Sequence, residues 1–349
     1  MKPFRNFAHQ AEQAIDKTRT KIKEKLDLFD PVIIFPYLGY SNGKIAYVSG
    51  RILEKEQVVH EVEELENNLW DNLHRTWKRY ESDEIPRVGV EGELAGRKTS
   101  TVSSEEGYFT LIFEDIEDLQ LKDGWHEVQL RIAHMPFDLE YEEEASVEVI
   151  VCNQQNEFGI ISDVDDTIME SNATSFLKKM RTMLSNTART RVVFEGVDKL
   201  YHNLCKDHYN PIFFVSGSSY NLYDKLIKFC EYNDIPKGPF FLRDIGLNAK
   251  QWIKQDTRPY KLDYIDEIMT TFDQLDFICI GDSGQQDPEI YREAHEKYPG
   301  RIKAIYIRHV YTDERQKELE GMASEMDIPL LVMEHSGDAL EHAKEQGWV

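Results

Sequence analysis

The sequence predicts an α/β domain built on a parallel sheet, preceded by a β-sandwich domain and an amphipathic N-terminal helix. Strand and helix patterns alternate through the C-terminal half, as is typical of a parallel sheet. Half a dozen short strand patterns separated by turns come before them, and these favour a β-sandwich. The chain has 349 residues, which exceeds the usual size of one hydrophobic core, so more than one domain is expected.

The first predicted element is an amphipathic helix over residues 1–28. Its apolar residues recur at helical spacing near one face and include Phe4, Phe7, Ile15 and Ile22. Basic residues outnumber acidic ones in this segment, although the whole chain carries a net charge of −23. Such a helix can lie on an anionic membrane surface or pack on its own protein. The sequence leaves both readings open, and packing is the commoner outcome.

A β-sandwich-like domain is predicted over residues 30–153. Its strand patterns are Val32–Tyr40, Lys44–Leu53, Val88–Leu94, Tyr108–Phe113, Val128–Ile132 and Val147–Val151. A helix is predicted within it at about residues 55–80, where apolar residues are spaced three and four apart. No catalytic grouping is visible in this part of the sequence, so we expect a binding or docking module.

The polar stretch Asn153–Asn156 marks the predicted boundary, and the α/β domain is predicted over residues 157–349. Its predicted strands are Phe158–Ser162, Pro211–Val215, Phe277–Ile280, Ile302–Ile307 and Pro329–Met333. Helices are predicted at Tyr220–Glu231, from Lys261 onward, and at Ala339–Glu345.

The stretch Phe158–Ile168 is the chemical centre of the sequence. An apolar strand pattern ends abruptly in Asp163, Asp165 and Asp166, with Thr167 behind them. Open α/β sheets place their functional groups at the carboxyl ends of such strands. Three neighbouring acids repel one another unless a cation lies among them, and an oxygen-rich grouping favours Mg²⁺. The alternative is an Asp-rich turn in which Asp166 or Thr167 caps a helix.

Polar groups of matching kinds follow two further strands. Phe213–Val215 runs into Ser216, Gly217 and Ser218, where a hydroxyl and free backbone N–H groups can hold an anion. Phe277–Ile280 runs into a glycine-containing segment with Asp282 and Asp287, which can complete a metal site. Lys261 offers a positive charge at a helix start. Paired carboxylates, a metal, a hydroxyl and a lysine are the parts of phosphoryl transfer through an aspartyl-phosphate.

These motifs carry a family resemblance. SDVDDTI, FFVSGSS, FFLRD and IGDSGQQDPEIY, in this order, resemble the fungal actin-patch phosphatidate phosphatases and their bacterial relatives. That family lies within the haloacid-dehalogenase superfamily of phosphotransferases. The resemblance implies a Rossmann-like haloacid-dehalogenase phosphatase domain, closely over about residues 155–335, and a Mg²⁺-dependent phosphoric monoester hydrolase.

The family's roles, carried over residue by residue, imply a mechanism. Asp163 is implied as the nucleophile and a metal ligand. Asp165 is implied as the acid that protonates the leaving alcohol and then activates water, while its carbonyl oxygen binds the metal. Thr167 is implied to hold the loop, Ser216 and Lys261 to grip the phosphoryl group together with Gly217, and Asp282 to complete the metal shell. Asp287 stays ambiguous: it can reach Mg²⁺ through water, orient Lys261, or start the next helix.

The resemblance also implies a substrate. Phosphatidate, hydrolysed to diacylglycerol and phosphate, or a related lipid phosphate is expected first, and a soluble phosphomonoester is the alternative. The segment Ser171–Phe194 contains five basic residues and no acid. This composition suggests a lid that binds an anionic group and presents an apolar, lipid-facing surface, or else an ordinary helix packed on the sheet. A third alternative is a protein led by its β domain, with an idle phosphatase domain. No Pro-rich tail follows the phosphatase domain in this sequence, so an actin connection is not carried over.

Net charge, cysteine pattern and the absence of long apolar runs limit the binding partners and the cellular location that we expect. A net charge of −23 argues against general nucleic-acid binding. The four cysteines are scattered without a CxxC pattern, as is typical of proteins whose cysteines stay reduced in the cytoplasm. No signal peptide and no membrane-spanning run is visible. We therefore expect a cytoplasmic protein, with peripheral contact to an anionic membrane as an option.

Overall fold

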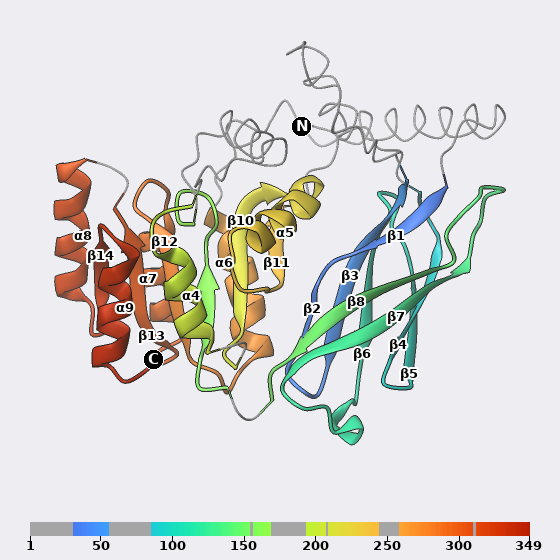
Figure 1. Ribbon diagram of the computed structural model, residues 1–349, viewed down its shortest axis with the longest axis horizontal. Coiled ribbons are helices and arrows are strands. Elements are labelled where there is room, and N and C mark those ends of the chain that lie inside the picture. Colours follow the sequence, from blue (N-terminus) through green and yellow to red (C-terminus); the bar gives the residue numbers. More distant parts are fainter. Residues whose placement is uncertain are drawn as a thin grey trace, which may run out of the picture. The chain divides into compact units, whose positions relative to one another are not determined.

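The computed structural model describes residues 31–55, 85–153, 156–168, 193–206, 209–243, 258–309 and 312–349 (Figure 1). The helices predicted at 1–28 and at about 55–80 lie outside these residues, as do residues 171–192 of the basic segment. The described chain divides into two compact units. One comprises the described parts of Met1–Tyr37, Tyr47–Phe113 and Glu127–Glu148, and the other those of Leu38–Ala46, Glu114–His126 and Val149–Val349. The predicted domain limits of 30–153 and 157–349 stay a prediction.

The first eight strands form one hydrogen-bonded sheet. They are β1 (Val32–Pro36), β2 (Gly39–Ser41), β3 (Ala46–Glu54), β4 (Gly89–Leu94), β5 (Arg97–Val102), β6 (Tyr108–Phe113), β7 (Gly124–His134) and β8 (Glu144–Val151), with a short 3₁₀ helix η1 at Glu117–Leu119. Their order is β1-β3-β2-β8-β7-β4-β5, and β6 pairs with β3. Because hydrogen bonds join all eight into one sheet, a sandwich of two separate sheets is not confirmed.

The second sheet is parallel, as the alternating patterns predict. Its strands are β9 (Gly159–Ser162), β10 (Ile212–Ser219), β11 (Phe240–Arg243), β12 (Phe277–Asp282), β13 (Ile302–Arg308) and β14 (Leu330–Met333), in the order β11-β10-β9-β12-β13-β14. Every pairing along this order is parallel. The five strands predicted here are confirmed within a few residues, whereas β11 was not predicted as a strand.

Helices cover both faces of the parallel sheet (Figure 1). They are α4 (Val197–Cys205), the 3₁₀ helix η2 (Tyr220–Leu222), α5 (Tyr223–Tyr232), α6 (Arg258–Thr271), α7 (Asp287–Lys297), α8 (Asp313–Glu325) and α9 (Ser336–Glu345). Side chains of α6, α7 and α8 pack in one core cluster with alternate strand residues such as Ile161, Phe213 and Cys279. None of the described helices is long and apolar enough to span a bilayer.

Strand order brings the predicted functional segments together. Strand β9 lies between β10 and β12, and all three run in the same direction. Asp163 directly follows β9, Ser216 lies in the last half of β10, and Asp282 ends β12. The carboxyl ends of three adjacent parallel strands therefore supply the polar groups of one site, as is usual in open α/β sheets.

Candidate active site

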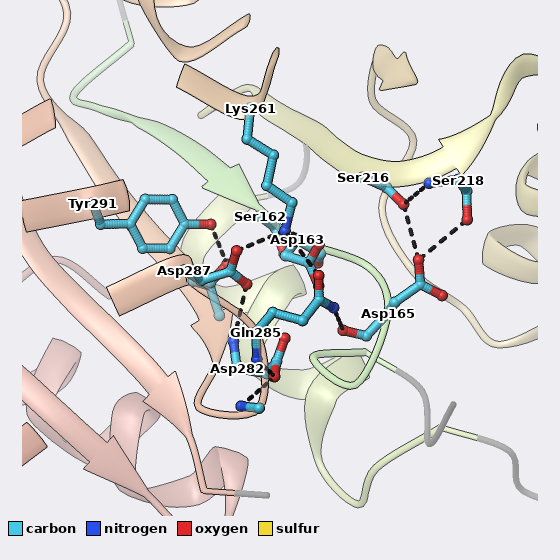
Figure 2. Close-up of polar contacts among 12 residues, drawn as sticks. Ser162, Asp163, Asp165, Ser216, Ser218, Lys261, Asp282, Gln285, Asp287 and Tyr291 are labelled. Carbon is cyan, nitrogen blue, oxygen red and sulfur yellow. Dashed lines mark hydrogen bonds and ion pairs between the residues drawn. The ribbon is translucent and has the colours of Figure 1, made fainter. Parts of the chain in front are cut away.

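The main chain of Asp163 is held on both sides. Its N–H donates to the carbonyl oxygen of Ile280 at 2.9 Å. The Ser162 hydroxyl donates to the Asp163 carbonyl oxygen at 2.7 Å and lies 2.6 Å from the Tyr201 hydroxyl of α4. The carboxylate of Asp163 is thus presented from a fixed backbone at the carboxyl end of β9 (Figure 2).

Lys261 forms ion pairs with two buried carboxylates. Its Nζ lies 2.8 Å from Asp163 Oδ1 and 2.6 Å from Asp287 Oδ1. All three side chains are buried, with Lys261 only 2% exposed. The ammonium group comes from the first turn of α6, and Asp287 begins α7, so the contacts join two helix starts to the strand end of Asp163.

Asp282 and Asp287 complete a compact carboxylate cluster with Asp163. Oxygen atoms of these three side chains lie within 4.8 Å of one another. Asp282 Oδ1 accepts hydrogen bonds from the N–H groups of Gly284 at 2.6 Å and Gln285 at 2.9 Å. Asp287 Oδ2 accepts one from the Asp282 N–H at 3.2 Å. The glycine-containing turn therefore fixes both carboxylates through backbone donors.

Burial and mutual repulsion shape the titration of this cluster. Burial, followed by repulsion from Asp287, raises the pKa of Asp282 to about 7. Burial also raises the pKa of Asp163 well above its usual range, although Lys261 opposes this. For Lys261, burial alone would lower the pKa, but attraction to Asp163 and Asp287 raises it well above the usual value. Without a further cation, the cluster therefore tends to keep a proton on one of its carboxyl groups.

The cluster fits a divalent cation bound by oxygen. Asp163 Oδ2 and Asp282 Oδ2 are buried and have no hydrogen-bond partner among the described residues. Three carboxylates against one ammonium group leave a formal charge of −2 when all are ionised. Mg²⁺ prefers carboxylate oxygen ligands and carries the matching charge. The residues that could hold it are Asp163, Asp282 and Asp287.

Asp165 points to a different part of the site. Its Oδ2 accepts hydrogen bonds from the hydroxyls of Ser216 and Ser218, each at 3.1 Å (Figure 2). Its carbonyl oxygen accepts one from Gln285 Nε2 at 3.2 Å. The side chain of Asp165 is thus directed to β10, while its backbone faces the turn after β12.

The far end of the nucleophile loop is held by Arg308. The Thr167 carbonyl oxygen accepts a hydrogen bond from Arg308 Nε at 2.9 Å, and Arg308 Nη2 donates to Ser336 Oγ at 2.7 Å. The Thr167 hydroxyl is buried and has no partner among the described residues. The loop residue Asp166 has φ 59°, a left-handed conformation that aspartate tolerates in tight turns. Arg308 ends β13, so a fourth strand end contributes to the site by supporting this loop.

The structure groups the predicted site residues into two sets. Asp163, Asp282, Asp287 and Lys261 form the carboxylate cluster with its ammonium group, and Asp165 lies with Ser216 and Ser218. For Asp287, the direct contact with Lys261 and the start of α7 are both observed. Gly217 lies between the two serines in β10, and Thr167 closes the nucleophile loop.

Two contributors, Gln285 and Arg308, were not singled out from the sequence, and Ser218 was named in its strand-end segment without a role of its own. Ser218 and Gln285 stand inside the quoted motifs, and their polar side chains beside predicted ligands were the available signal. Arg308 follows an apolar strand at its carboxyl end, as the aspartates do. The position of this basic residue at the end of an apolar strand was therefore the signal in the sequence that could have identified it.

Comparison with known proteins places this site in a matched region. Residues 158–309 match the family described as "Phosphatidate phosphatase APP1, catalytic domain". The chain is 32% identical over 151 residues to phosphatidate phosphatase APP1 of Saccharomyces cerevisiae, covering 43% of this chain and 25% of that protein. It is 29% identical over 161 residues to an uncharacterized protein of Schizosaccharomyces pombe, covering 46% and 26%. The chain thus spans about a quarter of the length of these relatives.

A solved structure is also similar. A haloacid dehalogenase-like hydrolase of Burkholderia xenovorans has 12% identity and a TM-score of 0.34, covering 55% of this chain and 98% of that one. The family match includes every residue of the carboxylate cluster, Asp165 and both serines. Residues 158–309 therefore match the family of the APP1 phosphatidate phosphatase catalytic domain, in agreement with the resemblance of the four motifs.

Proposed function

We propose that this chain is a phosphoric monoester hydrolase that works through an aspartyl-phosphate on Asp163. The observation that carries the proposal is the buried cluster of Asp163, Asp282, Asp287 and Lys261 at the carboxyl edge of the sheet. One oxygen of Asp163 is paired with Lys261 and the other has no partner among the described residues. A carboxylate held this way, beside a cation site, suits attack on phosphorus.

In the proposed first step, an Asp163 oxygen bonds to phosphorus and the bond from phosphorus to the alcohol oxygen breaks. A proton from the carboxyl group of Asp165 goes to that alcohol oxygen. In the second step water attacks the phosphorus of the aspartyl-phosphate, and Asp165 accepts the water proton. Phosphate leaves and the carboxylate of Asp163 is restored.

Mg²⁺ is the proposed cofactor, held by the carboxylates of Asp163, Asp282 and Asp287, with the carbonyl oxygen of Asp165 as a further proposed ligand. When bound, it would balance the negative charge of the carboxylates and of the phosphoryl oxygens. The orphaned oxygens of Asp163 and Asp282 support this assignment. Lys261 supplies a positive charge from the chain itself, and its ammonium group is placed to hold a phosphoryl oxygen beside Asp163. Ser216 supplies a hydroxyl group from the side of the site where Asp165 lies.

The proposed substrate is phosphatidate or a related lipid phosphate, from the family of the matched region. A soluble phosphomonoester is the alternative, because shared catalytic motifs specify phosphoryl chemistry better than the leaving group. We further propose peripheral contact with anionic membranes in the cytoplasm and no nucleic-acid partner. The complete set of catalytic groups opposes an idle phosphatase domain.

The deciding experiment assays the purified protein with Mg²⁺ against phosphatidate in mixed micelles and a panel of soluble phosphomonoesters. Asp163→Asn serves as the blank, and Asp327→Asn, which changes an exposed aspartate paired with His295, is the matched control. Turnover that needs Mg²⁺ and is lost only in Asp163→Asn supports the mechanism. A preference for phosphatidate supports the lipid substrate, and activity on soluble esters alone replaces it. No turnover on any ester contradicts the proposal.

The two basic segments have their own test. Removing residues 1–28 is expected to weaken binding to vesicles that contain anionic lipid, if this segment touches the membrane. Neutralising Lys178, Lys179 and Arg181 is expected to lower activity on phosphatidate vesicles more than on a soluble ester. Equal losses on both substrates would argue against a lipid-specific lid.

A further inference from the structure

Two hydroxyl groups converge on one oxygen atom of Asp165. Ser216 Oγ and Ser218 Oγ both lie 3.1 Å from Asp165 Oδ2 (Figure 2). The two serines are two residues apart in β10, and side chains at this spacing lie on the same face of a strand. The Ser-Gly-Ser segment therefore delivers a pair of donors to the carboxyl group that the proposed mechanism uses as its acid.

The two serines cannot both keep this contact during the proposed reaction. A hydroxyl has a single proton to donate. If Ser216 donates to a phosphoryl oxygen of the substrate, it no longer donates to Asp165. The oxygen of Ser216 is held in place by the backbone N–H of Ser218 at 3.0 Å, so its proton can change partner without a large movement of its oxygen.

We propose that Ser218 is a positioning residue for Asp165. Its hydroxyl holds the Asp165 carboxyl group in place when the Ser216 hydroxyl turns to the phosphoryl group. This inference rests on the proposed phosphatase function. Gln285 supports the same residue from the opposite end, because its side chain donates to the Asp165 carbonyl oxygen at 3.2 Å. Asp165 is then fixed at its backbone by one residue and at its side chain by another.

A leaving-group comparison tests this role. An alkyl alcohol leaves as a poor alkoxide and needs a proton from Asp165, whereas p-nitrophenolate leaves without one. In Ser218→Ala, kcat/KM for an alkyl phosphomonoester is expected to fall about tenfold or more, while kcat/KM for p-nitrophenyl phosphate changes less than about twofold. Ser218→Thr keeps a hydroxyl and is expected to restore the wild-type ratio of the two values.

Ser219→Ala is the matched control on the same strand. The Ser219 hydroxyl accepts a hydrogen bond from the Asn221 N–H at the start of η2, whereas the hydroxyls that donate to Asp165 Oδ2 are those of Ser216 and Ser218. This variant is expected to leave the ratio of the two kcat/KM values unchanged. Ser216→Ala is expected to lower kcat/KM for both esters, because it removes a hydroxyl that holds the phosphoryl group.

Several outcomes would overturn the inference. Equal losses on both esters in Ser218→Ala would show that Ser218 does not act through proton donation. The same asymmetry in Ser219→Ala would show a general effect of the strand. Ser218→Gly provides a second variant that lacks the hydroxyl, and circular dichroism checks that each variant is folded. A wild-type protein that hydrolyses neither ester would overturn the proposed function, and this inference with it.

Discussion

The ammonium group of Lys261 lies 2.8 Å from the Asp163 carboxylate, and both side chains are buried at the carboxyl edge of the parallel sheet. The same ammonium group lies 2.6 Å from Asp287. Two carboxylates from different parts of the chain thus share one buried cation. Burial makes an unpaired charge costly, so the loss of any one of the three groups is expected to destabilise the fold.

Lys261→Met tests this dependence. The variant leaves Asp163 and Asp287 buried without their cation, which is expected to destabilise the metal-free protein by about 3–5 kcal/mol. Activity on any phosphomonoester is expected to be lost as well. The free energy of unfolding from urea titration, measured with and without Mg²⁺, checks the first expectation, and added Mg²⁺ is expected to restore part of the stability.

Lys297→Met is the matched control. Lys297 pairs with Asp266 at the surface, where its side chain is 54% exposed, so its loss is expected to leave the free energy of unfolding almost unchanged. Equal destabilisation by the two substitutions would contradict the role given to the buried set.

Metal binding is expected to depend on pH. Burial and repulsion from Asp287 raise the pKa of Asp282 to about 7 in the metal-free protein, so a proton competes with Mg²⁺ below that pH. The affinity for Mg²⁺ is expected to rise as the pH rises through about 7. Calorimetry in buffers of different ionisation enthalpy would measure the affinity and the protons released. An affinity that stays constant between pH 5 and pH 8 would contradict this reading.

The stability of the metal-free protein should change in the opposite direction. Asp282 has a raised pKa in the folded state, so it binds its proton more tightly there than in the unfolded chain. Its contribution to stability is therefore fully present below the unfolded pKa of about 4 and lost as the pH rises through about 7. Thermal unfolding at several pH values, with chelator present, would show this loss. Asp282→Asn is expected to flatten the profile, because the amide does not titrate.

Much of this fold and site follows from local sequence patterns. Asp163 and Asp282 were predictable because each follows an apolar strand pattern whose carboxyl end faces the site. Ser216 was predictable for the same reason. Strand β5 was not predicted, since none of its residues is fully buried and its sequence lacks an apolar alternation. Its place in the sheet depends on its pairing with β4, and the local sequence pattern contains no information about that pairing.

The remaining site contacts depend on tertiary structure. The meeting of Gln285 with the Asp165 carbonyl oxygen joins residues 120 positions apart, and that of Arg308 with Thr167 joins residues 141 apart. No periodicity encodes such pairs. The sequence also left the role of Asp287 open. An aspartate that begins a helix and an aspartate that pairs with a distant lysine have the same local sequence, and only the structure places Lys261 beside Asp287.

Arg308 is expected to act on the nucleophile loop through its backbone. Arg308→Met removes the donor to the buried Thr167 carbonyl oxygen, which costs about 1–3 kcal/mol when left unsatisfied. Because this loop carries Asp163 and Asp165, kcat is expected to fall about tenfold or more. Steady-state kinetics and urea unfolding of the same preparation would measure both effects.

Arg301→Met is the control at the other end of the same strand. Arg301 precedes β13, and its guanidinium donates to backbone carbonyl oxygens of Phe272 and Leu275, each at 2.6 Å. It is expected to lower stability by a similar amount while leaving kcat nearly unchanged. If the two variants lost kcat equally, the effect would be a general loss of stability.

Gly281 is the position where a single methyl group should reach the cluster. A Cβ atom there would lie 2.6 Å from Asp287 Cβ, 2.7 Å from Asp287 Oδ2 and 2.9 Å from Tyr291 Cε2. These distances are too short for real atoms, so Gly281→Ala has to displace Asp287 or the start of α7. Asp287 would then move relative to Lys261 and Asp163, and we expect weaker Mg²⁺ binding together with a loss of activity of about 10²-fold.

Gly337→Ala separates this steric effect from the general effect of replacing glycine. Gly337 lies in the first turn of α9, and a Cβ atom there would have nothing within 4 Å. Alanine in a helix is favoured over glycine by about 0.5–1 kcal/mol, so this variant is expected to be equally or more stable and fully active. Isothermal titration with Mg²⁺ and unfolding curves for both variants would provide the comparison. Normal Mg²⁺ affinity in Gly281→Ala would mean that the position of Asp287 does not matter for the metal, which would remove Asp287 from the proposed ligands and leave it as the partner of Lys261.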